Sequence, residues 1–385
     1  DVRGAAVGDA ADREEGGVEV KVLVVAGARP NFMKVAPILR ALEAAGHEGV
    51  LVHTGQHYDA AMSDTFFQDL GLPEPNHHLG AGSGSHAVQT ARVMEAFEPV
   101  LMEVRPDWVV VVGDVNSTLA CSLVTAKLRE DLGCRLAHVE AGVRSHDWRM
   151  PEEVNRVLTD RMSDLLLTPS DAASRNLMAE GLEPERVVSV GNVMIDSLLA
   201  LLPRAREKKL PARMNLGEAP YAVATLHRPS NVDTPSALAT VLASFSRVAE
   251  EIPVVFPIHP RTRANAERFG LAASFDTLRV IEPLGYLEML SLTESAAVVL
   301  TDSGGLQTET TALGVPCITL REETEWTETV DQGTNMLVPW PLTVDGVADL
   351  LKVARGQVRS AAGRRRPNGW DGHAAERVVR ALDSW

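Results

Sequence analysis

The chain has 385 residues, of which 45% are hydrophobic and 23% charged, values that are ordinary for a globular protein with one or two well-filled cores. Its formal net charge of −15 argues against a general nucleic-acid binder, because neutralising phosphates requires a basic face. No apolar run reaches the length of a membrane span, so we expect no membrane partner and a cytoplasmic location.

Along the chain, β-branched apolar runs alternate with segments of helical spacing, joined by short links. This alternation predicts an α/β protein, with parallel sheets covered by helices on both faces. An acidic segment rich in Gly and Ala at residues 1–17 is predicted to be a flexible leader. The predicted strands of a first set then lie at residues 18–27, 48–55, 107–114, 134–140, 165–170 and 187–191. The helices between them are predicted at residues 31–46, 85–104, 117–131, 151–164 and 171–181.

A basic, Pro-containing stretch at residues 203–220 separates this set from a second one of the same kind. The second set has predicted strands at residues 221–227, 253–259, 278–283, 296–304, 316–320 and 334–339. We therefore predict two doubly wound Rossmann-like domains, at residues 18–195 and 215–360, that face one cleft. The last helix, within residues 371–385, is predicted to pack back on the first domain.

Four side chains suited to proton transfer lie where predicted strands end or helices begin. Asp114 and Glu140 follow strands of the first domain, and Glu152 lies in the first turn of a helix that Pro151 opens. His227 follows the first strand of the second domain. Because the carboxyl ends of parallel strands share one edge where ligands bind, these groups are candidate acids and bases. The alternatives are helix capping for Asp114, surface ion pairs for the glutamates and a buried structural histidine.

Two strand-to-helix loops have features of anion-binding sites. In the first domain, Gly27 permits a tight turn, Arg29 can bind a phosphate with two hydrogen bonds, and Lys34 follows one helical turn later. In the second domain, the glycine-containing loop at residues 303–305 brings bare backbone to a helix N-terminus, and Glu309 comes one turn on. The loop residues that we expect to contact an anion there are Ser303, Gly304 and Gly305. A plain glycine turn with a surface glutamate is the alternative.

Metal, nucleotide-cofactor and acyl-transfer signatures are missing from the sequence. Cys121, Cys134 and Cys317 are far apart in apolar runs, which favours buried reduced thiols. The pair at His77 and His78 is expected in a loop without metal-binding partners. There is no Rossmann glycine fingerprint, Walker A motif or nucleophile elbow. We therefore predict that the protein uses neither a metal nor a cofactor.

An ordered series of motifs resembles the non-hydrolysing UDP-N-acetylglucosamine 2-epimerases. It comprises GARPNFMKVAPI, TGQHYD, RPDWVVVVGDVNSTLA, HVEAGVRS, MPEEVNR, GNVMID, LHRPSNVD, IHPRT, LTDSGGLQTE and GVPCITLREETE, and covers nearly everything from residue 18 to residue 385. The resemblance implies the two-domain glycosyltransferase-B fold, a homodimer and a UDP-sugar substrate. It also implies inversion at C2 of the sugar, by elimination of UDP to a glycal and re-addition.

The resemblance implies a role for each matching position. Asp114, Glu140 and Glu152 match the family's catalytic acids, and His227 matches the group that serves the diphosphate. The remaining matches are substrate contacts at Arg29, Lys34, Leu284, Met289, Ser303, Gly304, Gly305, Glu309 and Arg321, with Leu284 and Met289 beside the uracil. Which carboxylate takes the proton and which returns it stays open.

The sequence departs from the family pattern at two places. Where a common pattern reads T-E-R-P, this chain has Thr324-Glu325-Trp326-Thr327, a change that we expect to alter the sugar pocket. A Gln-His-Arg segment associated with an activating second UDP-N-acetylglucosamine reads Gln56-His57-Tyr58. Three alternatives therefore remain: the same chemistry on UDP-glucose or another UDP-sugar, a hydrolysing variant that releases UDP and free ManNAc, and a sensor that binds without turnover.

Overall fold

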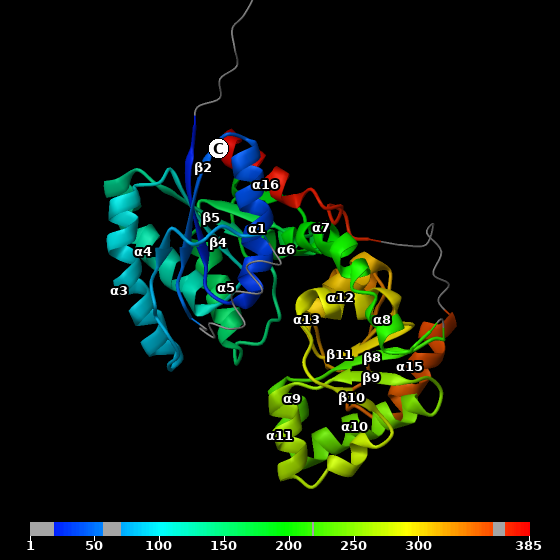
Figure 1. Ribbon diagram of the computed structural model, residues 1–385. Helices are drawn as coiled ribbons and strands as arrows, with labels where there is room; N and C mark the ends of the chain where they lie inside the picture. The colour runs from blue at the N-terminus through cyan, green and yellow to red at the C-terminus, as the bar shows by residue number, and fades with distance from the viewer. Residues whose placement is uncertain (1–18, 57–70, 218, 357–365) are drawn as a thin grey trace, which may run out of the picture.

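The computed structural model describes residues 19–56, 71–217, 219–356 and 366–385. The chain forms two α/β units, each built on one parallel sheet, as the sequence predicts (Figure 1). The predicted leader lies outside the described residues.

The first sheet has the strand order β3-β2-β1-β4-β5-β6-β7, and its central strands are buried. Helices α1 and α7 cover one face, and α3 and α4 cover the other. The strands are β1 (Lys21–Ala26), β2 (Glu48–His53), β3 (His77–His78), β4 (Trp108–Val112), β5 (Arg135–Val139), β6 (Leu165–Thr168) and β7 (Val187–Ser189). The helices are α1 (Arg29–Ala44), α3 (His86–Val104), α4 (Asn116–Leu132), α5 (Pro151–Met162), α6 (Asp171–Ala179) and α7 (Val193–Glu207), with a 3-10 turn η1 (Pro184–Arg186).

The second sheet has the order β10-β9-β8-β11-β12-β13. In both sheets the order reverses beside the first strand of the unit, which is the arrangement that opens a ligand crevice at the carboxyl edge. The strands are β8 (Ala222–Thr225), β9 (Val254–Pro257), β10 (Arg279–Ile281), β11 (Val298–Thr301), β12 (Cys317–Thr319) and β13 (Asn335–Leu337). The helices are α8 (Leu210–Arg213), α9 (Pro229–Val232), α10 (Pro235–Ala249), α11 (Pro260–Arg268), α12 (Tyr286–Ser295), α13 (Gly304–Leu313), α14 (Thr327–Asp331), α15 (Val344–Gly356) and α16 (Ala374–Ser384), with a 3-10 turn η2 (Ala272–Phe275).

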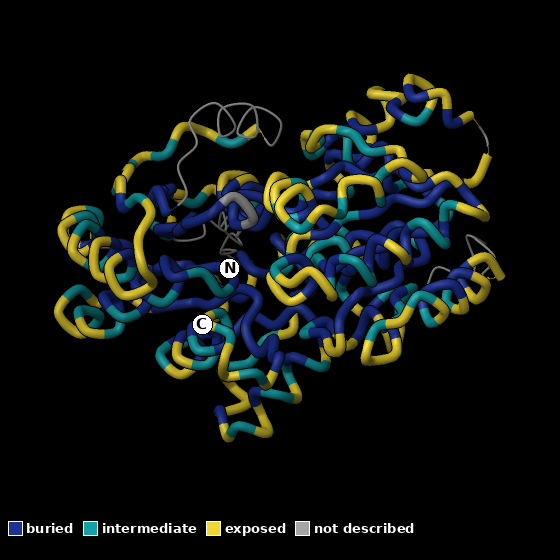
Figure 2. The backbone as a smooth tube through the Cα atoms, turned by 90° about the horizontal axis from the view of Figure 1, so that it is seen from below, coloured by how far each residue is buried: buried dark blue, intermediate teal, exposed yellow. Residues whose placement is uncertain are grey.

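Helix α7 joins the two units, since it packs on α1 in the first and on α12 and α13 in the second. Buried side chains therefore run continuously from one sheet across α7 to the other (Figure 2). Helix α16 lies against α1 and α7, and the carboxylate of Asp196 on α7 accepts hydrogen bonds from the first two amides of α16 at 3.1 and 2.7 Å. The predicted boundaries at residues 195 and 215 stay predictions, because α7 belongs to both cores.

One prediction about secondary structure was wrong. His77 and His78 form the edge strand β3 rather than a loop, and the ring of His78 contacts His53 with a nitrogen–nitrogen distance of 2.7 Å. The cysteine prediction is confirmed, because Cys121, Cys134 and Cys317 are buried free thiols. Among the described helices, none combines the length and apolarity required to cross a bilayer.

Candidate active site

Glu140, the acid at the tip of β5, is held in a tight pocket by Lys34 of α1. The Lys34 Nζ lies 2.7 Å from Oε1 of Glu140, and both side chains are only 8% exposed. Glu140 has a φ of +75°, a left-handed backbone that is uncommon outside glycine and marks functional positions. Its Oε2 atom is buried without a hydrogen-bond partner among the described residues. A buried carboxylate oxygen left without a donor is costly, so it is suited to meeting a ligand.

Gly113, at the end of β4, makes room for this ion pair. Its φ is +66°, and a Cβ at this position would lie 2.7 Å from the Lys34 Nζ and 3.7 Å from Oε1 of Glu140. Any side chain here would strain the turn and displace the lysine. The glycine therefore brings the tips of β4 and β5 together around the Lys34–Glu140 pair.

Asp114 follows Gly113 directly and faces α5. Its Oδ2 lies 3.6 Å from the guanidinium of Arg156, and the side-chain amide of Asn155 donates to its backbone carbonyl at 2.8 Å. The Asp114 side chain keeps 30% exposure, whereas Arg156 is buried. Asp114 does not cap the helix α4, because its N-cap residue is Val115. The structure thus leaves the carboxylate of Asp114 open to a ligand and paired with a cation behind it.

Two adjacent glutamates at the start of α5 have different surroundings. Glu153 is buried, and its carboxylate accepts hydrogen bonds from the backbone amides of Ser145 and His146, which fixes the β5–α5 loop. Glu152, the predicted acid, is half-buried, and its negative charge acts on Arg228 of the second unit. Glu152 therefore lies at the cleft, opposite the other sheet, whereas Glu153 supports the loop.

His227 sits at the end of β8, fixed by an aspartate that the sequence analysis did not single out. Asp302, fully buried after β11, lies 2.9 Å from the His227 Nδ1 and accepts hydrogen bonds from the backbone amides of His227 and Arg228. Burial raises the pKa of Asp302, but the hydrogen bond and charge of His227 and the two amides bring it below its usual value. The imidazole keeps 44% exposure, so its other nitrogen remains open to a ligand.

Arg321, Arg228 and Glu325 form a charged cluster in the second unit. Glu325 lies 2.7 Å from Arg321 and 3.5 Å from Arg228. Burial raises the pKa of Glu325, but Arg321, Arg228 and, across the cleft, Arg156 lower it below its ordinary value. The pKa of Arg228 is lowered first by burial and then by Arg321, while Glu325, Asp302 and Glu152 oppose the shift. These couplings place the acid edge of the first sheet opposite the cationic edge of the second.

The glycine loop before α13 lies next to this cluster. Ser303 caps α13, and its hydroxyl accepts a long hydrogen bond from the amide of Leu306 at 3.5 Å. A Cβ on Gly304 would lie 2.7 Å from Oε1 of Glu325, so only glycine fits there. Ser303, Gly304 and Gly305 are all partly exposed at the helix N-terminus, where the amides and the helix dipole favour an anion.

Glu309, one turn into α13, is buried rather than open on the surface. Burial raises its pKa to about 7, while a hydrogen bond with Tyr286 opposes the shift. Leu284 and Met289, beside Tyr286, are partly buried and pack on the core that includes α7 and α12. The side chain of Arg29 lies outside the described residues, as do His57 and Tyr58, so the predictions on them stay predictions.

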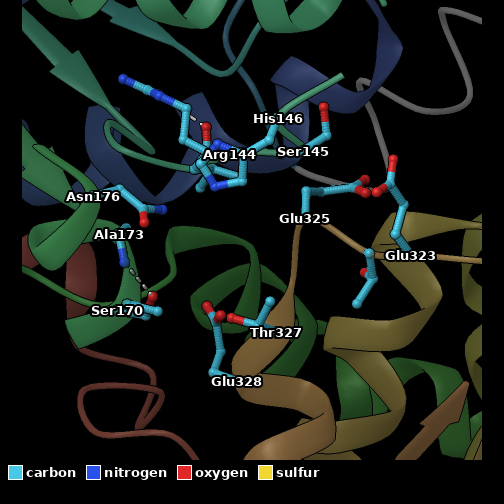
Figure 3. Close-up of a pocket in the computed structure, with 13 residues that line it drawn as sticks. Arg144, Ser145, His146, Ser170, Ala173, Asn176, Glu323, Glu325, Thr327 and Glu328 are labelled. Atoms are coloured by element: carbon cyan, nitrogen blue, oxygen red, sulfur yellow. Dashed lines mark hydrogen bonds between the residues drawn. The ribbon is translucent and has the colours of Figure 1, made fainter. Parts of the chain in front are cut away.

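Trp326, the departure from the family pattern, lies where the two units meet. It is 5% exposed and packs edge-on against Trp370, with ring centroids 6.1 Å apart. Beside it, a cavity of about 170 Å³ lies between the β5–α5 loop with α6 and the segment at residues 323–328 (Figure 3). Glu328 is buried beside this cavity; burial raises its pKa, and a hydrogen bond with Ser170 of the first unit opposes the shift. The expected effect of Trp326 on the sugar pocket stays a prediction.

Within the described parts of the chain, no three His, Cys, Asp or Glu side chains gather closely enough to hold a metal ion. The independence from metal and cofactor stays a prediction.

Sequence reasoning missed Asp302, Asn155 and the pairing of Arg156 with Asp114. Asp302 follows an apolar strand in the same way as Asp114, so the strand-end rule was a signal that could have found it. Nothing in the helical spacing distinguishes Arg156 from other arginines, because its partner comes from a loop more than forty residues earlier.

Two doubly wound sheets that face each other across a cleft, one edge acidic and the other with an anion loop, define a protein of the glycosyltransferase-B fold class. A family model described as UDP-N-acetylglucosamine 2-epimerase matches residues 40–383. The chain belongs to this family.

Individual relatives agree with this assignment. The UDP-N-acetylglucosamine 2-epimerase of Methanocaldococcus jannaschii is 40% identical, over 94% of this chain and 99% of the relative. Its crystal structure in complex with UDP-GlcNAc and UDP has a TM-score of 0.84 at 39% identity, covering 95% of this chain and 100% of that one. The UDP-2,3-diacetamido-2,3-dideoxy-D-glucuronate 2-epimerase of Pseudomonas aeruginosa is 43% identical, over 83% of this chain and 88% of the relative.

Proposed function

We propose that the protein is a UDP-N-acetylglucosamine 2-epimerase, an isomerase that interconverts UDP-GlcNAc and UDP-ManNAc. The observation that carries the proposal is the arrangement around Glu140: a strained, buried carboxylate, paired with Lys34 on one oxygen and open on the other, opposite an anion loop of the second unit. Family membership supports the same reading.

In the proposed reaction, a carboxylate of the first unit removes the proton from C2 while the bond between C1 and the UDP oxygen breaks. The product is a glycal and free UDP, both held in the cleft. A carboxylic acid then returns a proton to C2 on the opposite face, and UDP adds back to C1. Asp114, Glu140 and Glu152 are the groups that we assign to these proton transfers. Both the base and the acid roles fit each of them, so their order is left open.

The second unit is assigned the leaving group. His227, oriented by Asp302, presents a ring nitrogen to the diphosphate, and Ser303, Gly304 and Gly305 present backbone amides. Arg321 of this unit, together with Arg29 and Lys34 of the first, adds positive charge around the substrate. Glu309 is assigned to the ribose hydroxyls, and Leu284 and Met289 to the uracil. No step in this scheme calls for a metal or a redox cofactor.

We also propose that the enzyme is a cytoplasmic homodimer that supplies polysaccharide biosynthesis. The resemblance to the family motivates the dimer. Val88 and Met102, which are 43% and 53% exposed along α3, provide apolar surface for such a contact. Light scattering on the purified protein would test the dimer, and a monomer at micromolar concentration would contradict it.

A second candidate substrate is the one named for the Pseudomonas aeruginosa relative, UDP-2,3-diacetamido-2,3-dideoxy-D-glucuronate. Its similarity to this chain is comparable to that of the Methanocaldococcus jannaschii epimerase. The two substrates have the same group at C2 and differ at C3 and C6, so the same acids would serve both.

The test is a substrate panel followed by proton NMR. UDP-GlcNAc, UDP-glucose, UDP-GalNAc and the diacetamido-glucuronate are each incubated with the enzyme, and the C2 configuration and free UDP are measured. We expect UDP-GlcNAc to equilibrate with UDP-ManNAc without net release of UDP. Accumulation of UDP and free ManNAc would instead indicate the hydrolysing variant. Binding without inversion of any sugar would indicate a sensor and contradict the proposal.

A further inference from the structure

Behind the candidate acids lies a buried group of charged side chains that the proposed reaction does not use. His138 on β5 and Asp160 on α5 are fully buried, with the His138 Nδ1 2.6 Å from Oδ1 of Asp160. The His138 Nε2 lies 2.8 Å from the backbone carbonyl oxygen of Gly113. The other oxygen of Asp160 lies 2.7 Å from Arg144, which also pairs with Glu180 of α6. No solvent reaches the imidazole, so these partners alone decide its protonation.

The hydrogen-bond partners require a proton on both ring nitrogens of His138. A backbone carbonyl can only accept, so the Nε2 must donate to Gly113. Asp160 also accepts a hydrogen bond from the amide of Gly142 at 3.1 Å and faces Arg144, as an ionised carboxylate does. Burial raises the pKa of Asp160, but the charges and hydrogen bonds of His138 and Arg144 bring it below its usual value. With Asp160 ionised, the Nδ1 must donate as well.

The place where this ring is bound links it to the candidate acids. Gly113 precedes Asp114, and a Cβ on Gly113 would lie 3.7 Å from Oε1 of Glu140. Glu140 itself follows His138 by two residues on the same strand. One imidazole thus joins the tip of β4 to the tip of β5, and it fixes the two backbones that carry the acids.

We propose that His138 is a buried imidazolium that serves as a positioning residue for the proposed epimerase site, holding the Asp114 turn and adding a fixed positive charge behind Asp114 and Glu140. This inference rests on the proposed function. The charged groups around the ring are Asp160 and Arg156 from α5, Arg144 from the loop, Glu180 from α6, Lys34 from α1 and the two acids themselves.

The fixed charge has a consequence that a purely structural histidine would lack. A cation close to a carboxyl group favours its ionised form, so removing the cation makes the neighbouring acids harder to ionise. For a partly buried cluster, the expected change is a rise of about one pH unit in the apparent titration of the acids. The acid side of the pH–rate profile reports that titration.

The first test measures protonation directly in the wild-type protein. Histidine labelled with ¹⁵N is observed by NMR, and the His138 ring is assigned by through-space contacts to the buried strand. We expect both ring nitrogens to carry protons from about pH 6 to pH 9, where an ordinary histidine loses its charge. A single protonated nitrogen in this range would overturn the proposal. This measurement needs no turnover, so it stands even if the assigned substrate is wrong.

The second test separates charge from geometry with the variant His138→Gln. Glutamine keeps a donor for the Gly113 carbonyl but has no charge. The acid limb of kcat/KM should move up by about one pH unit, whereas the control His146→Gln, at an exposed histidine of the following loop, should leave the profile unchanged. A uniform loss of rate at every pH, without a shift, would overturn the proposed role of the charge. If the variant does not fold, the NMR result on the wild-type protein still decides.

Discussion

Replacing Glu309 with glutamine should stabilise the protein at neutral pH and leave it unchanged in acid. Glu309 is 7% exposed, and burial raises its pKa from 4.5 to about 7 in the folded state. Between these two values the unfolded chain releases a proton that the folded chain keeps. Stability therefore falls as the pH rises through this window, by about 3 kcal/mol in total at 1.36 kcal/mol per pH unit. Glutamine has the same shape and no charge, so the variant escapes this loss.

The assay is urea unfolding followed by tryptophan fluorescence at a series of pH values. The difference in unfolding free energy between Glu309→Gln and wild type should be small below pH 4.5 and should grow to about 3 kcal/mol in favour of the variant above pH 7. Glu267→Gln, at an exposed glutamate of α11, is the matched control and should show no such growth. A difference that stays flat with pH, or that favours the wild type at high pH, would refute the reasoning.

Three further predictions concern the site and its support. Asp114→Asn, Glu140→Gln and Glu152→Gln should each lower kcat by at least about a hundredfold, the usual scale for acid–base groups, and near-normal rates in all three would remove their assignment. Asp302→Asn should lower kcat by about tenfold or more while changing KM less, because His227 loses the partner that orients it toward the leaving group; an unchanged kcat would contradict this. Trp370→Ala should cost about 3 kcal/mol or more in urea unfolding, because it removes a ring that is 1% exposed and its 2.9 Å hydrogen bond to the Pro169 carbonyl; a loss below about 1 kcal/mol would count against it.

The strand-end rule recovered much of the site because it depends only on the alternation of strands and helices. Asp114, Glu140 and His227 follow β4, β5 and β8, and the parallel sheets bring these ends to facing edges. The same alternation predicted the two-unit fold, since each β-branched run became a buried strand. Local sequence sufficed wherever the answer depended on the position along an element.

What the sequence did not reveal depends on contacts between distant segments. Glu152 and Glu153 are neighbours with equal claims, and only the tertiary structure shows that Glu153 is used to hold the β5–α5 loop. Trp326 packs on Trp370, which lies more than forty residues further along the chain. The raised pKa of Glu309 follows from complete burial, which a helix-surface pattern does not predict. His77 and His78 were assigned to a loop because two residues carry no periodic signal.

The most direct test of the central claim is solvent exchange at C2. UDP-GlcNAc is incubated with the enzyme in deuterated water, and the hydrogen at C2 is followed by NMR in both epimers. If carboxylates of the first unit remove and return that proton, deuterium should enter at C2 of UDP-ManNAc as it forms. An inverted product that retains only protium at C2 would contradict the mechanism.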